Sequence, residues 1–325
     1  MRQLILLFKK NKWLKRLVYF FLILFIFINV LAYHHVYLFT HFEKENAENI
    51  QQYENLSFIE KKFMLLKGIK QKRPANDKIP SIAHDTITLN DKYKTHAWLI
   101  PNHESKGTVI LFHGYGGCKS DLMDQSNVFF QLGYSVMLVD FMGCGNSQGD
   151  FTSLGYYESE QVVNCIHYLT SKSEKNIYLY GQSMGSVAIL KALSENNVKV
   201  KGIILECPFA SLLSTVKSRF KIMETPSFPL AELLVLWGGV QMDYNGFKHK
   251  PVDYAKNVHC PTLILHGLQD NRVSRKEIED IYKQLPSVNK SIEYFTDSGH
   301  ENYLKKYKNE WTKTVSNFLT SISYQ

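Results

Sequence analysis

The sequence predicts an α/β fold: a mostly parallel eight-stranded sheet with helices on both faces, preceded by an N-terminal apolar helix. Two observations lead to this prediction. From residue 83 onward, short apolar segments alternate with segments of helical length, a pattern typical of parallel sheets. Residues 17–39 also form one apolar run without Asp, Glu, Lys or Arg. A run of that length is sufficient to cross a lipid bilayer as a helix.

The composition is that of a globular protein with a basic N-terminal tail. Of the 325 residues, 45% are hydrophobic and 21% are charged, and the net charge is +8. Residues 1–32 contain no acid, and six basic residues precede the apolar run: Arg2, Lys9, Lys10, Lys12, Lys15 and Arg16. Because these six supply most of the net charge, the charge indicates a membrane surface and excludes a nucleic-acid partner.

The apolar run is predicted to be a transmembrane anchor over residues 17–39, since roughly 20 residues of helix span the hydrocarbon layer. The basic segment 1–16 precedes it and acidic residues follow it, so the positive-inside rule places residues 1–16 in the cytoplasm. The rest of the chain then lies on the non-cytoplasmic side. Two alternatives remain: a signal peptide cleaved near Ala32, which would give a secreted or periplasmic protein, and a buried core helix.

Residues 40–79 are predicted to form a partly helical stalk between the anchor and the domain. They are rich in Glu, Lys, Asn and Gln, and Pro74 and Pro80 mark their end. The remaining residues, 80–325, form the predicted globular domain. A protein lacking residues 1–40 is therefore expected to be soluble and to retain any activity that the domain has.

The strands are assigned from short apolar segments, and the helices from the longer segments between them. Two alternating segments form an opening hairpin, and six near-continuous apolar runs are expected of strands buried on both faces. The predicted strands are Asp85–Leu89, Thr95–Ile100, Thr108–Phe112, Ser135–Val139, Ile177–Tyr180, Lys201–Leu205, Thr262–Leu265 and Ser291–Phe295. The predicted helices are Asp121–Leu132, Tyr157–Ser171, Met184–Glu195, Arg275–Leu285 and 303–320.

One connection is too long for a simple crossover between strands. It runs from Pro208 to Cys260 and contains many apolar residues, among them Leu233, Leu234 and Trp237. Connections of this length usually carry structure of their own. Residues 208–260 are therefore predicted to form a small, mostly helical cap over the site.

The pattern Gly-x-Ser-x-Gly occurs twice, around Ser147 and around Ser183. A nucleophile of this type sits on a sharp turn between a strand and a helix. Ser183 directly follows the strand ending at Tyr180 and precedes a helix-like segment, whereas Ser147 lies in a loop well past its strand. Ser183 is therefore the predicted nucleophile, with Gly181 and Gly185 as its elbow glycines, and Ser147 is expected to be structural.

A serine nucleophile needs a base that is itself oriented by an acid. His300 follows the last predicted strand and Asp270 follows the preceding one, so both project from the carboxyl edge of the sheet, where sites of open α/β sheets form. Asp297 is the alternative acid, but it stands only three residues from His300. The predicted triad is Ser183, Asp270 and His300.

The oxyanion of a tetrahedral intermediate needs backbone N–H donors. Met184, which follows the nucleophile, is the first predicted donor. The second is Tyr115, in the glycine-rich loop after Phe112, where Gly114 and Gly116 flank it. An ordinary turn is the alternative interpretation of this loop.

These motifs together resemble the α/β-hydrolase superfamily, and within it the subgroup of serine aminopeptidases and monoacylglycerol lipases. The resemblance covers residues 80–323. The motifs that carry it are His113-Gly-Tyr-Gly-Gly117, Asp140-Phe-Met-Gly-Cys-Gly-Asn-Ser-Gln-Gly149, Gly181-Gln-Ser-Met-Gly185, Pro261-Thr-Leu-Ile-Leu-His-Gly-Leu-Gln-Asp270 and Gly299-His300. It implies hydrolysis through an acyl-enzyme without a cofactor or metal. Relatives commonly have Arg where Met142 stands, which puts one loop contact in doubt and leaves the triad intact.

Five cysteines are present, and their spacing matches no metal site. The resemblance makes the strands that end at Phe112 and Val139 neighbours, so Cys118 and Cys144 fall in adjacent loops. A disulfide between them is one alternative in an oxidising compartment, and free thiols are the other.

The sequence thus predicts a serine hydrolase that cleaves acyl esters or thioesters of lipid-like or small apolar substrates. Its predicted partners are a small acyl substrate and a membrane, and the oligomeric state is left open. The alternatives are a peptidase or amidase, an acyltransferase that uses the same triad, and a non-catalytic binding protein built on this fold.

Overall fold

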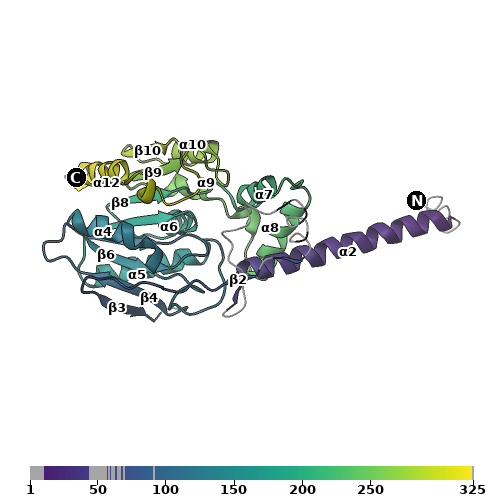
Figure 1. Ribbon diagram of the computed structural model, residues 1–325, viewed down its shortest axis with the longest axis horizontal. Coiled ribbons are helices and arrows are strands. Elements are labelled where there is room, and N and C mark those ends of the chain that lie inside the picture. Colours follow the sequence, from purple (N-terminus) through teal and green to yellow (C-terminus); the bar gives the residue numbers. More distant parts are fainter. Residues whose placement is uncertain are drawn as a thin grey trace.

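The structure is a computed structural model that describes residues 11–43, 57, 59, 63, 67–68, 70–90 and 92–323. The basic residues Arg2, Lys9 and Lys10 and about half of the predicted stalk lie outside these ranges. A globular α/β domain carries a helical cap on one side, and a long helix, α2 (Lys12–Thr40), runs outward from the cap (Figure 1).

The predicted sheet is confirmed, with eight strands in the order β10-β9-β8-β7-β5-β6-β4-β3. Strands β3 and β4 form the antiparallel hairpin, β4 also pairs antiparallel with β6, and the other neighbours are parallel. The strands are β3 (Asp85–Leu89), β4 (Thr95–Ile100), β5 (Thr108–Phe112), β6 (Ser135–Val139), β7 (Ile177–Gln182), β8 (Gly202–Glu206), β9 (Thr262–Gly267) and β10 (Lys290–Phe295).

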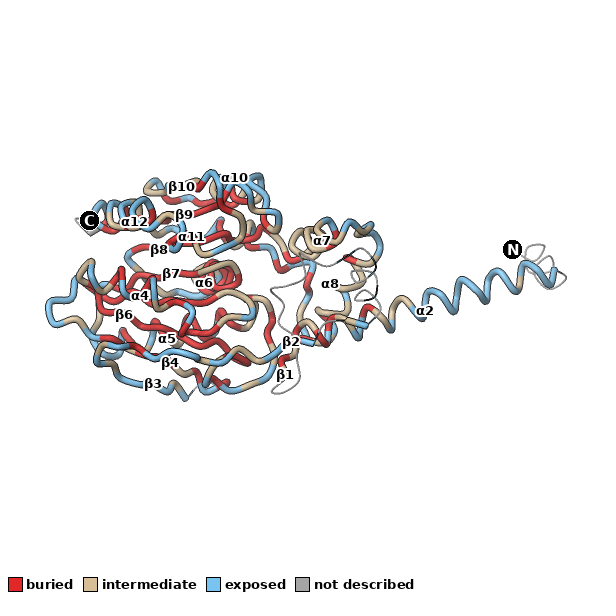
Figure 2. Tube along the Cα trace, viewed as in Figure 1, coloured by how far each residue is buried: buried red, intermediate tan, exposed pale blue. Residues whose placement is uncertain are grey.

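Helices cover both faces of the sheet. Side chains of α5, α6 and α10 pack on one face, and those of α4, α11 and α12 pack on the other. Figure 2 shows the central strands as the most continuously buried part of the chain. The bounds are η2 (Lys119–Leu122), α4 (Met123–Gln131), α5 (Glu158–Ser171), α6 (Met184–Glu195), α10 (Arg275–Gln284), α11 (Tyr303–Lys306) and α12 (Lys308–Ser323).

The long connection between β8 and β9 contains only helices and turns. Two of them, α7 (Leu212–Ile222) and α8 (Leu230–Gln241), lie side by side next to the end of α2 (Figure 1). Three short helices complete it: η3 (Gly246–Lys248), α9 (Pro251–Tyr254) and η4 (Ala255–Asn257).

Helix α2 spans Lys12–Thr40 and is long and apolar enough, by length and composition, to cross a membrane. Its large apolar side chains are all exposed from Trp13 to Phe27, whereas near its C-terminal end Val36 and Leu38 are buried. There it packs along α8, where the indole Nε1 of Trp237 donates a hydrogen bond to Asn29 Oδ1 at 3.0 Å.

The chain after α2 contacts the domain directly. Strand β1 (Phe42–Glu43) pairs with β2 (Gln71–Lys72), both within the range that the sequence assigns to a stalk. The guanidinium of Arg73 donates to the carbonyl oxygens of Ser147 and Gly149. The described ends of the predicted stalk therefore pack against the glycine-rich loop that follows β6.

Candidate active site

Ser183 sits on a strained turn between β7 and α6, with φ +46° and ψ −107°. This region is unfavourable for a residue with a Cβ atom and is typical of functional sites. Close packing around the turn requires the two flanking glycines. A Cβ at Gly181 would lie 2.6 Å from Gly185 C, and one at Gly185 would lie 2.4 Å from the carbonyl oxygen of Phe112.

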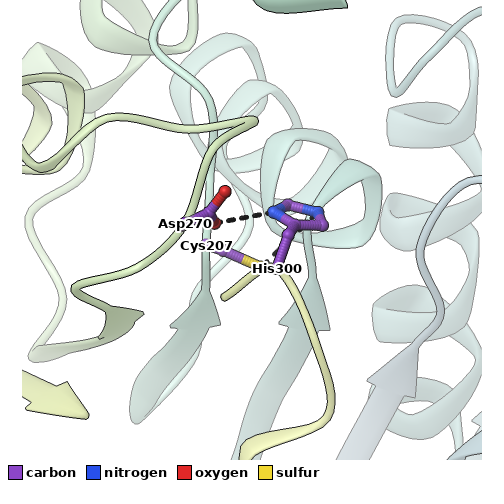
Figure 3. Close-up of side chains that lie close together, drawn as sticks. All are labelled: Cys207, Asp270 and His300. Carbon is purple, nitrogen blue, oxygen red and sulfur yellow. Dashed lines mark hydrogen bonds and ion pairs between the residues drawn. The ribbon is translucent and has the colours of Figure 1, made fainter. Parts of the chain in front are cut away.

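The three residues of the predicted triad lie together at the carboxyl edge of the sheet. Ser183 Oγ is 3.1 Å from His300 Nε2, and His300 Nδ1 is 2.7 Å from Asp270 Oδ2. Figure 3 shows the carboxylate of Asp270 directed at the imidazole ring, above the tips of the strands. Since a carboxylate only accepts, Nδ1 carries the proton and Nε2 is free to accept from the serine hydroxyl.

Asp270 is held as an anion. Burial alone would raise its pKa, but the hydrogen bond and charge of His300, together with the backbone N–H groups of Val273 and Arg272, lower the pKa below its ordinary value. Those two N–H groups donate to Oδ1 at 2.8 and 2.7 Å. The carboxylate therefore orients the imidazole and would stabilise an imidazolium.

The alternative candidates lie elsewhere. Ser147 is buried, and its hydroxyl donates to the carbonyl of Asp140 at 2.6 Å and accepts from His96 N–H at 2.8 Å. Asp297 is exposed, and its backbone N–H donates to Tyr307. The structure thus places Ser147 in the scaffold of its loop.

The loop of the predicted oxyanion donor lies beside the nucleophile. A Cβ added at Gly114 would be 3.6 Å from Ser183 Cβ, and Gly117 N–H donates to Gly114 O, which closes a turn with Tyr115 inside it. His113 braces this loop, because its Nε2 accepts from Phe141 N–H at 3.0 Å and its Nδ1 donates to Gly114 O at 2.8 Å. Burial lowers the pKa of His113, which keeps it neutral.

Cys207 and Glu206, at the end of β8, lie next to the triad, and neither was predicted to be a site residue. Cys207 has φ +41°, and its Sγ is 3.8 Å from His300 Nε2. Burial, reinforced by the charges of Asp270 and Glu206, raises the pKa of the Cys207 thiol well above its ordinary value. A single cysteine after an apolar strand carries no recognisable motif, so only the fold reveals this contact.

Donor atoms of Cys207, Asp270 and His300 lie within 4.8 Å of one another. Zinc sites usually use three or four such ligands. Asp270 already engages Nδ1 of the imidazole, so a single ion at Nε2 could take only the thiolate as a second ligand of this set. The triad hydrogen bonds account for the cluster better than a metal centre does.

Glu206 is fully buried beneath the elbow. Its backbone oxygen accepts from Ser183 N–H at 2.8 Å, and its carboxylate accepts from Trp311 Nε1 at 2.6 Å and from Gln182 Nε2 at 3.1 Å. Burial raises the pKa of Glu206 to about 7, although hydrogen bonds from Trp311, Tyr180 and Gln182 counteract part of this effect.

An open cleft of about 630 Å³ adjoins His300. The lining of the cleft is net positive, because Arg272, Lys305 and Lys306 outnumber the one acidic residue, Glu301. His300 and Asn302 complete the lining.

None of the five cysteines, all of them among the described residues, forms a disulfide in the structure, Cys118 and Cys144 included. The thiol of Cys118 instead donates to the carbonyl of Ala75 at 3.3 Å. The disulfide alternative is therefore not realised in this structure. Met142 is buried, and its N–H donates to Gln161 at 2.8 Å.

The fold, with a serine elbow at the carboxyl edge of the sheet, defines an α/β hydrolase. Residues 121–323, more than half of the chain, match the prolyl oligopeptidase family, and the chain belongs to that family. The structure is similar to that of the Pyrococcus furiosus esterase Pf2001, with a TM-score of 0.67 and 23% identity over 78% of this chain and 97% of the esterase.

Related sequences include proteins with and without a described activity. An uncharacterized Bacillus subtilis protein, YqkD, is 25% identical over 74% of this chain and 84% of its own length. An uncharacterized membrane protein of Saccharomyces cerevisiae, YNL320W, is 25% identical over 66% and 72%. The lysophosphatidylserine lipase ABHD12 of Mus musculus is 26% identical over 56% of this chain and 46% of the lipase.

Proposed function

We propose that this α/β hydrolase is a serine hydrolase that cleaves acyl esters or thioesters through an acyl-enzyme. The observation that carries the proposal is the continuous hydrogen-bonded chain from Ser183 through His300 to Asp270 at a strained elbow. In this arrangement the base contacts the nucleophile and the acid orients the base.

In the first step, Ser183 Oγ attacks the carbonyl carbon of the substrate while His300 Nε2 takes the hydroxyl proton. The developing oxyanion accepts hydrogen bonds from the N–H groups of Met184 and Tyr115. When the tetrahedral intermediate collapses, His300 returns the proton to the leaving alkoxide or thiolate. Water then attacks the acyl-enzyme with His300 again as the base, which releases the acid and restores Ser183.

The surroundings of the triad support a substrate with a polar or anionic leaving group. His300 protonates the leaving group, and the positively charged cleft opens beside this same residue. The murine relative named as a lysophosphatidylserine lipase acts on a substrate of that kind, as its name states. A lysophospholipid-like ester therefore fits the proposal.

The second candidate activity is peptide or amide hydrolysis. Membership of the prolyl oligopeptidase family favours it. The same triad serves both reactions, since amide cleavage requires only that His300 protonate a leaving amine.

We also propose that α2 is a membrane anchor, with the domain on the non-cytoplasmic side. Its exposed apolar length supports this, as does the relative named as a membrane protein. The division into basic segment, anchor, linker and hydrolase domain with a cap at about 208–260 is part of the same proposal.

The test is fluorophosphonate labelling of the full-length protein in detergent, beside Ser183→Ala and the matched control Ser147→Ala. We expect labelling to be lost only in Ser183→Ala. Rates on acyl esters, thioesters and peptide anilides would then decide between the two activities. Equal labelling of all three proteins would refute the assignment of the nucleophile.

A further inference from the structure

The end of helix α2 contacts the loop that carries one proposed oxyanion donor. The ring of Phe39 stacks on that of Tyr115, with centroids 4.6 Å apart and planes 11° apart. The hydroxyl of Tyr115 donates to the carbonyl oxygen of Phe39 at 2.7 Å. The ring of Phe42 lies 6.2 Å away from that of Tyr115. Residues 39–42 therefore hold this side chain along its ring and at its hydroxyl.

The backbone on either side of Tyr115 consists of glycine. Gly114 precedes it, and Gly116, which follows, has φ +70° with no atom within 4 Å of where its Cβ would be. Glycines place few conformational limits on a chain. Besides the bonds that Gly114 O accepts from His113 and Gly117, the side chain of Tyr115 provides a contact through which the end of α2 holds this turn.

Residues 39–42, which contact the side chain of Tyr115, are themselves joined to the domain by backbone hydrogen bonds. Thr152 N–H donates to the carbonyl of Thr40 at 2.9 Å, and Phe42 N–H donates to that of Asp150 at 2.6 Å. The end of the helix is therefore joined to the loop after β6 at two points. These two bonds fix the position of the helix end relative to the domain.

We propose that Phe39 is a positioning residue of the active site: by stacking on Tyr115 it fixes the backbone N–H of Tyr115, which donates to the oxyanion. In this proposal α2 is an apolar anchor, and its C-terminal end also positions a loop of the active site. This inference rests on the proposed serine hydrolase function. It reverses the expectation that the domain keeps its activity without residues 1–40.

The expected effect falls on turnover. An oxyanion donor acts mainly in the transition state, so its displacement lowers kcat and leaves KM nearly unchanged. Complete loss of one donor typically costs about 10²–10³ in kcat. A loosened but present donor should cost less, and we expect a decrease of about tenfold.

The experiment measures ester hydrolysis by full-length protein in detergent, with kcat expressed per site titrated by a fluorophosphonate. The perturbing variant is Phe39→Ala, and Phe39→Tyr is the conservative variant that keeps the stacked ring. The matched control is Phe25→Ala, on the same helix, where the side chain is 62% exposed. We expect kcat to fall about tenfold only in Phe39→Ala, with KM within about twofold of wild type.

Counting titrated sites separates loss of folded protein from loss of turnover. If Phe39→Ala yields no titratable protein, Tyr115→Phe provides the test, because it removes only the hydroxyl bonded to Phe39 and should lower kcat about threefold. The proposal would be overturned if Phe39→Ala, or Tyr115→Phe where it replaces that variant, had the same turnover per site as Phe25→Ala. Failure of the wild-type protein to label or to hydrolyse any ester would instead reject the proposed function.

Discussion

The buried carboxyl group of Glu206 should make stability depend on pH in a way that one substitution removes. Glu206 lies in the interior with neutral neighbours, Trp311, Tyr180 and Gln182, and burial raises its pKa from 4.5 to about 7. An unfolded chain exposes this group and lets it ionise near its ordinary pKa. Between these two values the folded protein keeps a proton that the unfolded chain has released.

The sign and size of the effect follow from this difference. Below about pH 4.5 both states are protonated and the group contributes no pH dependence. As the pH rises to about 7, the free energy of unfolding decreases by about 1.4 kcal/mol per pH unit, or about 3 kcal/mol in total, and then levels off. Glu206→Gln cannot ionise, so this decrease should be absent from the variant.

The assay is urea unfolding of the full-length protein in detergent, followed by circular dichroism at about pH 5 and pH 8. Relative to wild type, Glu206→Gln should be more stable at pH 8 than at pH 5 by about 2.5 kcal/mol. Glu104→Gln, at an exposed glutamate, is the control and should show no such difference. If the gap between Glu206→Gln and wild type is the same at both pH values, the buried-acid reasoning is wrong.

Two further predictions concern the triad and the elbow. Asp270→Asn should keep the fold but lower kcat by about 10³–10⁴, since the amide favours the wrong imidazole tautomer; a loss below about tenfold in steady-state ester hydrolysis would contradict the role of Asp270. Gly185→Ala should destabilise the protein by about 2 kcal/mol, because the new Cβ would lie 2.4 Å from Phe112 O. Thermal unfolding measures this, with Gly238→Ala as the control, where the nearest atom is 3.5 Å away and little change is expected; equal midpoints for the two alanine variants would count against a steric role for Gly185.

The sheet could be predicted because its strands carry local signals. A strand buried on both faces needs an unbroken apolar run, and the runs beginning at Thr108 and Ser135 match β5 and β6 residue for residue. The relative positions of Ser183, Asp270 and His300 could also be predicted from the sequence. Each lies within five residues of the carboxyl end of a strand, and the carboxyl ends of parallel strands share one edge of the sheet.

Contacts between distant segments could not be predicted in the same way. Phe39 and Tyr115 are 76 residues apart, and Glu206 and Trp311 are 105 apart. Nothing in the local sequence distinguishes Phe39 from the other phenylalanines of an apolar helix. Likewise, Arg73 stands in a polar stretch typical of a linker, and only the fold brings it to the carbonyls of the glycine-rich loop.

Glu206 and Asp270 lie at the ends of neighbouring strands, and their different surroundings give the two carboxyl groups different roles. Glu206 pairs with Leu265 across β8 and β9, and Asp270 follows β9 closely. Asp270 accepts two backbone N–H bonds and faces His300, so its anion is stabilised. The carboxyl group of Glu206 faces the neutral donors Trp311, Tyr180 and Gln182 in the interior and retains a proton up to about pH 7. Below that pH, one ionised carboxylate of this pair serves the imidazole, while the neutral one supports the elbow through its backbone oxygen. A second anion beneath Ser183 would oppose the developing oxyanion, so the burial that keeps Glu206 protonated below about pH 7 favours catalysis, while it lowers the stability of the folded protein as the pH rises.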